Sequence, residues 1–217
     1  MTADLFESVA DVLPSREAMA EGAVLLRGLA SPVETALLAA LLAIESEAPF
    51  RRMFTPGGHQ MSVAMTNCGE AGWLTDRSGY RYDGADPESG KPWPAMPAVF
   101  RELAEGAARD AGFARFAPDA CLINRYEPGA KMSLHQDRDE KDFSAPIVSV
   151  SLGLPATFLF GGMKRTERPQ RYRLEHGDVV AWGGPSRLFF HGVAPLADGE
   201  HPALGRKRIN LTFRKAR

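Results

Sequence analysis

The chain has 217 residues, of which 44% are hydrophobic and 24% are charged, and its formal net charge at pH 7 is -1. This composition is ordinary for a globular domain, and it supplies enough apolar side chains for a core that needs neither disulfides nor a structural metal. The longest apolar run, 36–44, is too short to cross a bilayer, so we expect no membrane partner.

The cysteines and the first residues indicate the compartment of the chain, and the positions of its basic residues indicate possible phosphate contacts. Cys68 and Cys121 fit no zinc or haem spacing, so reduced thiols are expected. The first residues lack a basic-then-apolar signal, which predicts a cytoplasmic chain. Basic residues cluster in 164–173 and in 201–217. Such clusters can bind phosphates, although charge alone favours a solvated surface.

Two helices are predicted in the first half of the chain. The segment 31–34 (SPVE) is typical of a helix start, with a capping box and an early proline, and this helix should run to about Ala48. A second helix is predicted over 97–111, closed by Gly112. Between them, 54–97 is rich in glycine, proline and aromatic residues, which favours short strands and a loop-rich lid.

The second half of the chain is rich in short β-type runs separated by glycine and proline. This pattern favours a sandwich or barrel over parallel βαβ units. We therefore predict one mainly β (α+β) domain over 1–217, with helices and the lid in 22–112 and a β-sandwich in 118–214. The predicted strands are 120–126, 146–153, 156–160, 171–174, 178–182, 187–191 and 208–213.

The tripeptide His135-Gln136-Asp137 is the first candidate for chemistry. On an extended segment alternate side chains share a face, so His135 and Asp137 can supply two corners of a metal site. One more histidine would complete the two-histidine, one-carboxylate set that leaves positions open on iron(II). His176, His191 and His201 are the downstream candidates. We favour His191, at the end of the predicted strand 187–191, because a glycine follows it and allows close backbone approach.

The last predicted strand is the second candidate. Along 208–214 apolar and polar residues alternate, so Arg208, Asn210 and Arg214 share a face. The two arginines could converge on a small dianion, because each guanidinium suits a carboxylate. Asn124 and Tyr126 add same-face hydrogen-bonding groups on another strand. The alternative is an amphipathic edge strand with its polar side in water.

These motifs occur together with others in a recognisable order. The chain resembles the bacterial AlkB family of Fe(II)- and 2-oxoglutarate-dependent nucleic-acid dealkylases, and the similarity covers roughly 22–214. Several long motifs in order are far more specific than one HxD. The stretches that carry the resemblance are 124–139 (NRYEPGAKMSLHQDRD), 182–192 (WGGPSRLFFHG), 208–214 (RINLTFR), 55–69 (TPGGHQMSVAMTNCG) and 91–97 (KPWPAMP).

The resemblance implies a double-stranded β-helix, or jelly roll, that holds Fe(II) and takes 2-oxoglutarate and O2 as co-substrates. It implies that His135, Asp137 and His191 are both the metal ligands and the catalytic residues. It also implies oxidative demethylation of N-alkylated bases with release of formaldehyde and succinate. The residues implied to bind or adjoin 2-oxoglutarate are Asn124, Tyr126, Trp182, Arg208, Asn210 and Arg214.

The resemblance further implies how a damaged base is recognised. N1-methyladenine and N3-methylcytosine are cationic, so a carboxylate and an aromatic face near the pocket would favour them. Because the base must leave its stack, alkylated single-stranded DNA is the expected substrate. His59 stands where relatives tend to carry tyrosine, which keeps a ring but not its hydroxyl. The implied substrate contacts are Met65, Trp73, Tyr80, Asp139 and Arg165, with Ser149 lining the pocket.

Other functions remain open at this point. The same iron chemistry could act on RNA or on a protein side chain, and the fold could serve as a nucleic-acid-binding module without catalysis. A binding module has no need of a buried dianion site, which speaks against the last possibility. Single strands of DNA and RNA present similar base faces, so the sequence does not separate them. A monomer is expected.

Overall fold

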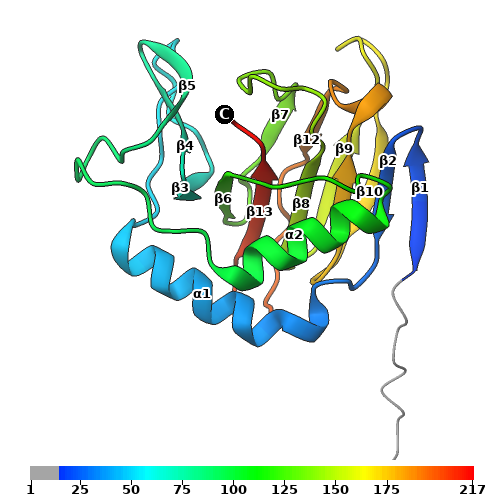
Figure 1. The fold of residues 1–217 in the computed structure, drawn as a ribbon, viewed down its shortest axis with the longest axis horizontal. Helices are drawn as coiled ribbons and strands as arrows, with labels where there is room; N and C mark the ends of the chain where they lie inside the picture. The colour runs from blue at the N-terminus through cyan, green and yellow to red at the C-terminus, as the bar shows by residue number, and fades with distance from the viewer. Residues whose placement is uncertain (1–14) are drawn as a thin grey trace, which may run out of the picture.

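The computed structural model describes residues 15–217, and Figure 1 shows their arrangement. The first residues, on which the prediction of no export signal depends, lie outside the described residues. No helix in 15–217 combines the length and the apolar character needed to cross a membrane.

The largest sheet has seven strands in the order β1-β2-β11-β8-β13-β6-β3. All of its neighbouring strands pair antiparallel, and only β1 and β2 follow each other directly along the chain. It takes in three strands from outside the predicted 118–214 sandwich. The strands are β1 (Arg16–Ala20), β2 (Ala23–Leu26), β11 (Val179–Trp182), β8 (Ile147–Gly153), β13 (Arg208–Arg214), β6 (Ala120–Tyr126) and β3 (Ala64–Gly69).

A second antiparallel sheet has four strands in the order β10-β9-β12-β7. From β6 onward the chain passes repeatedly between the two sheets, and side chains from both form one apolar cluster between them. The predicted mainly β jelly roll is confirmed. The strands are β10 (Gln170–Leu174), β9 (Ala156–Phe160), β12 (His191–Val193) and β7 (Met132–His135), and a separate hairpin consists of β4 (Gly72–Asp76) and β5 (Gly79–Asp83).

Two helices, α1 (Glu34–Glu47) and α2 (Ala98–Asp110), lie across one face of the large sheet (Figure 1). Their apolar side chains and those of the sheet form a second cluster, in which Phe100 of α2 meets Phe213 of β13 edge-to-face at 5.9 Å between ring centroids. The helix predicted over 97–111 is confirmed. Because the two helices cover this face of the large sheet, the site described below lies on its opposite face, between the two sheets.

β13 is a central strand, between β8 and β6, and all of its residues are buried. The residues Ile209, Leu211 and Phe213 belong to the helix-side cluster, whereas Arg208 and Arg214 line a pocket on the opposite face. The predicted alternation is confirmed. The alternative of an edge strand with its polar side in water is wrong.

Two local predictions are wrong. Ser31 does not cap a helix; it begins a short 3-10 helix, η1 (Ser31–Val33), and Glu34 instead lies 3.3 Å from His176 Nε2. The predicted strand 187–191 is a turn that follows η2 (Gly184–Ser186), and regular pairing begins only at His191. At the start of this stretch the buried Arg187 side chain donates hydrogen bonds to carbonyl groups of two other segments.

The contact between α2 and β13 gives a first prediction. Phe100→Ala should lower the free energy of unfolding by about 3–5 kcal/mol, because the side chain is fully buried and its loss leaves a cavity. Leu42→Ala on α1, where the leucine is 67% exposed, is the control and should change it little. Urea denaturation of both variants measures the difference. Equal losses would contradict the assignment of the core.

Candidate metal centre

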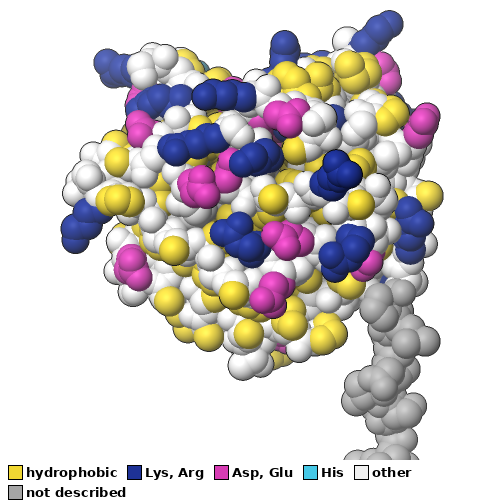
Figure 2. Space-filling model, viewed as in Figure 1, with side chains coloured by type: hydrophobic (Ala, Val, Ile, Leu, Met, Phe, Trp, Pro, Cys, Tyr) yellow, Lys and Arg dark blue, Asp and Glu magenta, His cyan; other side chains and the backbone are white. Residues whose placement is uncertain are grey.

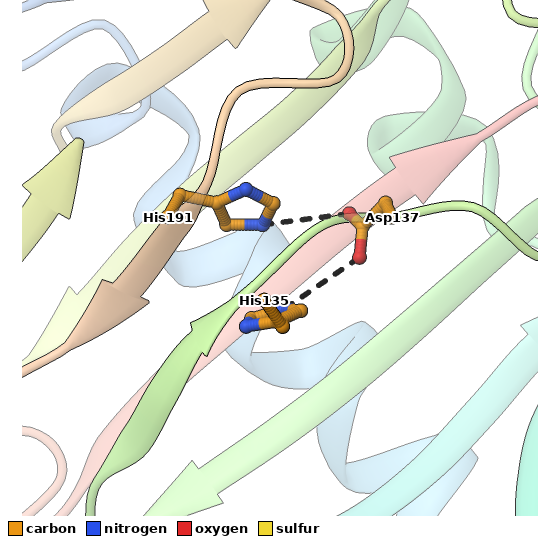
Figure 3. Close-up of side chains that lie close together, drawn as sticks. All are labelled: His135, Asp137 and His191. Atoms are coloured by element: carbon orange, nitrogen blue, oxygen red, sulfur yellow. Dashed lines mark ion pairs between the residues drawn. The ribbon is translucent and has the colours of Figure 1, made fainter. Parts of the chain in front are cut away.

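Three side chains converge at one end of the gap between the sheets. His135 ends β7, His191 begins β12, and the two are directly opposite in the strand pairing. Asp137 follows two residues after β7. One ligand atom of each residue lies within 4.8 Å of the others, and each Nε2 is 3.6 Å from an Asp137 carboxylate oxygen. Figure 3 shows both imidazoles pointing toward this carboxylate.

Both histidines are oriented by their backbone neighbours. Nδ1 of His135 lies 2.9 Å from the Ser133 carbonyl oxygen, and Nδ1 of His191 lies 3.0 Å from that of Phe189. Each Nδ1–H therefore donates to a carbonyl and leaves the Nε2 lone pair for a metal. Burial, together with the nearby His135, lowers the pKa of His191 to about 4, so its ring is neutral at physiological pH.

Asp137 is held by two arginines. Arg214 donates to Oδ2 from Nε at 3.0 Å and from Nη2 at 2.7 Å, and Arg187 donates to the Asp137 backbone carbonyl at 2.9 Å. Burial alone would raise the pKa of Asp137. The charges of Arg214 and of the two histidines outweigh that effect and hold the pKa well below its usual range. The carboxylate is therefore ionised although its side chain is only 9% exposed.

Gly192 allows the two strands that carry the histidines to approach closely. A Cβ atom at Gly192 would lie 2.6 Å from the Met132 carbonyl oxygen, which is closer than real Cβ contacts. The predicted close approach after His191 is confirmed. His176 and His201, the other candidates for the third ligand, stack on each other at 4.4 Å between centroids and do not join the cluster.

A pocket between the sheets adjoins these three side chains, and it contains a buried cation. Arg208 is 1% exposed, and its Nη2 donates to Ser151 Oγ at 3.0 Å. Its Nε and Nη1 have no partner, and no carboxylate of residues 15–217 pairs with it. Two more polar atoms without partners, Asn124 Oδ1 and Trp182 Nε1, belong to the pocket lining.

The residues predicted to bind 2-oxoglutarate differ in whether their polar atoms already have hydrogen-bond partners within the protein. Asn210 Nδ2 donates to Ser149 Oγ and to a backbone carbonyl, and its Oδ1 accepts from Thr212. The Arg208 guanidinium lies over the Tyr126 ring, 5.0 Å from its centroid. Arg214 lies at the Asp137 end of the pocket. The free donors are therefore at Arg208 and Trp182.

This arrangement suits a particular pair of ligands. Two imidazoles and one carboxylate on one side of a metal leave coordination positions open, which is the donor set of non-haem iron(II) oxygenases. Burying a guanidinium without a counter-ion costs free energy, and a carboxylate bound beside it offsets that cost. The residues therefore fit iron(II) together with a small dicarboxylate.

The predicted substrate residues divide into two groups. Trp73 of β4 and Tyr80 of β5 stack at 5.6 Å between centroids, and Trp73 Nε1 donates to Asp139 at 2.7 Å. These three lie together beside the metal-ligand segment. Met65 is 1% exposed in the core, and Arg165 lies exposed in the loop after β9. His59 is exposed, and its backbone pairs with Thr55.

Three residues around the centre do not belong to the predicted site. Tyr82, Glu140 and Arg187 form a hydrogen-bonded group next to Asp137. In the sequence, Glu140 is visible only as a second acid directly after Asp139, and Arg187 only as an arginine at the start of an apolar run. Neither signal indicates a partner, because the partners come from distant segments.

Known proteins share this chain's sequence and fold. A model of the 2OG-Fe(II) oxygenase superfamily matches residues 22–214. The alpha-ketoglutarate-dependent dioxygenases AlkB of Salmonella typhimurium and Escherichia coli are each 58% identical over 213 residues, covering 98% of this chain and 97% of theirs. A solved structure of OsALKBH1 has a TM-score of 0.80 at 29% identity, covering 93% of this chain and 100% of that one. The chain belongs to the 2OG-Fe(II) oxygenase superfamily and, within it, to the AlkB dioxygenases.

Proposed function

We propose that this chain is an Fe(II)- and 2-oxoglutarate-dependent DNA demethylase that acts on N1-methyladenine and N3-methylcytosine. The observation that carries the proposal is the position of a two-histidine, one-carboxylate cluster beside a buried arginine that lacks a counter-ion. The similarity to AlkB dioxygenases over nearly the whole chain supports the same conclusion.

In this proposal His135, Asp137 and His191 hold iron(II), and Arg208 pairs with a carboxylate of 2-oxoglutarate. Iron(II) held there, together with 2-oxoglutarate, would supply the reduction of O2, in which one oxygen atom enters succinate with loss of CO2 and the other hydroxylates the methyl carbon. The C–N bond of the resulting cationic N-hydroxymethyl base would then break: its electrons return to the ring nitrogen as a lone pair, formaldehyde leaves, and the hydroxyl proton passes to solvent. Asn124, Tyr126, Trp182, Asn210 and Arg214 complete the pocket for 2-oxoglutarate.

The β4–β5 hairpin supplies the proposed base-recognition lid of a single domain. The stacked rings of Trp73 and Tyr80 offer an aromatic face, and Asp139 offers a negative charge, both of which favour a cationic methylated base. Met65 and Arg165 stay proposed substrate contacts. Flipping a base out of a single strand costs less than opening a pair, which favours single-stranded DNA.

Charge at the surface is consistent with a phosphate backbone near this lid. Figure 2 shows Lys and Arg side chains along the upper edge of the molecule, over the β4–β5 hairpin and its surroundings. Arg77 and Arg81 belong to this hairpin region, and the exposed Arg138 and Lys141 flank the acids of 139–140. We place this activity in a cytoplasmic monomer.

Asp137→Ala tests the metal centre. Replacing a residue that supports a ligand costs roughly 10–100-fold, so loss of a ligand should lower turnover by more than about a hundredfold. Asp142→Ala, an exposed acid on the same segment, is the matched control and should retain activity. Formaldehyde and succinate are measured with an oligodeoxynucleotide containing N1-methyladenine. Full activity of Asp137→Ala would sink the proposal.

The same assay, run in parallel on RNA of identical sequence, separates the nucleic-acid classes. We expect faster release of formaldehyde from single-stranded DNA than from RNA. Turnover on RNA alone would move the assignment to an RNA demethylase, and absence of turnover on either would favour a binding role.

Arg208→Gln tests the 2-oxoglutarate pocket. Removing one partner of a buried ion pair costs about 3–5 kcal/mol, so the Kd for 2-oxoglutarate should rise by about a hundredfold or more. The variant without ligand should be no less stable than the wild type, because an unpaired buried charge is lost. Titration of the Mn(II)-loaded proteins measures the Kd, with the exposed Arg171→Gln of β10 as control. An unchanged Kd would place the dicarboxylate elsewhere.

A further inference from the structure

Glu140 is a buried acid that the proposed reaction does not use. Its side chain is 2% exposed, and it has three partners. Tyr82 donates to Oε1 at 2.6 Å, Arg214 Nε lies 3.3 Å from the same oxygen, and Arg187 Nη2 donates to Oε2 at 3.1 Å. Burying a carboxylate requires such partners, so this one is fully engaged within the protein.

Both arginines that contact Glu140 also hold Asp137. Arg214 reaches the Asp137 carboxylate, and Arg187 reaches its backbone carbonyl. Glu140 and Asp137 therefore share two cations, which gives a buried group of two negative and two positive charges. Because Arg214 lies between the two acids, the pull of Glu140 limits how strongly Arg214 competes with a metal for Asp137.

The third partner of Glu140 connects this group to the hairpin. Tyr82 on β5 is directly opposite Trp73 on β4, and Trp73 donates to Asp139, the residue before Glu140. Burial raises the pKa of Tyr82 well above its usual value, so the hydroxyl stays protonated and remains a donor. Two facing residues of the hairpin are thus bonded to two consecutive acids that follow Asp137.

We propose that Glu140 is a positioning residue, which sets the Asp137 carboxylate through Arg187 and Arg214 and makes its position depend on the β4–β5 hairpin through Tyr82. Binding of a base at the hairpin then strengthens metal binding at residues more than fifty positions away in sequence, to which the hairpin is connected by one hydrogen-bond network. The hairpin part of this inference rests on the proposed function; the link from Glu140 to Asp137 does not.

The link from Glu140 to Asp137 can be tested by measuring metal affinity in the absence of nucleic acid. Glu140→Gln leaves Arg214 paired with Asp137 alone, so the Kd for Mn(II) in the presence of 2-oxoglutarate should rise by about tenfold or more. Glu45→Gln removes an acid from another arginine, Arg125, at 3.0 Å, and should leave this Kd unchanged. Thermal unfolding of both variants reports whether they fold. An unchanged Kd in folded Glu140→Gln would overturn the proposal.

Tyr82→Phe tests the hairpin link and keeps the ring. In the wild type, a single strand with N3-methylcytosine should lower the Kd for Mn(II) by about fivefold or more, and in Tyr82→Phe this coupling should fall below about twofold. Tyr172→Phe, which loses a hydrogen bond to the Met19 carbonyl and belongs neither to the hairpin nor to the group around Glu140, is the control and should keep the coupling. A merely structural role would lower stability without removing the coupling.

The outcomes separate this inference from the proposed function. Coupling that persists in Tyr82→Phe would overturn the hairpin link, whatever the enzyme's turnover. A wild type that binds Mn(II) and 2-oxoglutarate but neither binds nor demethylates methylated strands would sink the proposed function. In that case the effect of Glu140→Gln on metal affinity would still support the link from Glu140 to Asp137.

Discussion

The pairing of His191 with His135 across β12 and β7 is the contact on which the rest of the site depends. It places two imidazoles side by side, with centroids 4.4 Å apart, and their Nδ1 atoms bound to nearby carbonyls fix which nitrogen faces the metal. Gly192 makes the pairing possible because a side chain there would collide with the Met132 carbonyl. The third ligand needs no strand of its own, since Asp137 lies two residues after His135 on the same segment.

Charged side chains at the two ends of the pocket differ in whether they are paired within the protein. Around Asp137, the acids and arginines pair with one another within the protein. At Arg208 the protein supplies only a serine hydroxyl and an aromatic ring, and the guanidinium keeps free donors. The unpaired Arg208 guanidinium therefore attracts an anion, whereas His135, Asp137 and His191 offer the ligand atoms for a metal.

Sequence patterns predicted those parts of the structure that depend on neighbouring residues. Alternation along 208–214 identified the two faces of β13, and the spacing of His135 and Asp137 identified two ligands on one segment. The patterns did not show that Arg187 would be buried, because its partners, Ala145 and Asp137, lie more than forty positions earlier. For the same reason 187–191 looked like a strand, and Glu140 looked like one more acid in a charged loop.

β13 carries the arginines of the pocket on one face and supports the helices with Ile209, Leu211 and Phe213 on the other. A defect in the helical layer is thus separated by only one strand from the arginines that line the pocket. A screen that scores survival under alkylating stress would therefore recover changes at Phe213 or Phe100 among its inactive clones. Such positions would look like parts of the reaction centre, although neither side chain faces the pocket.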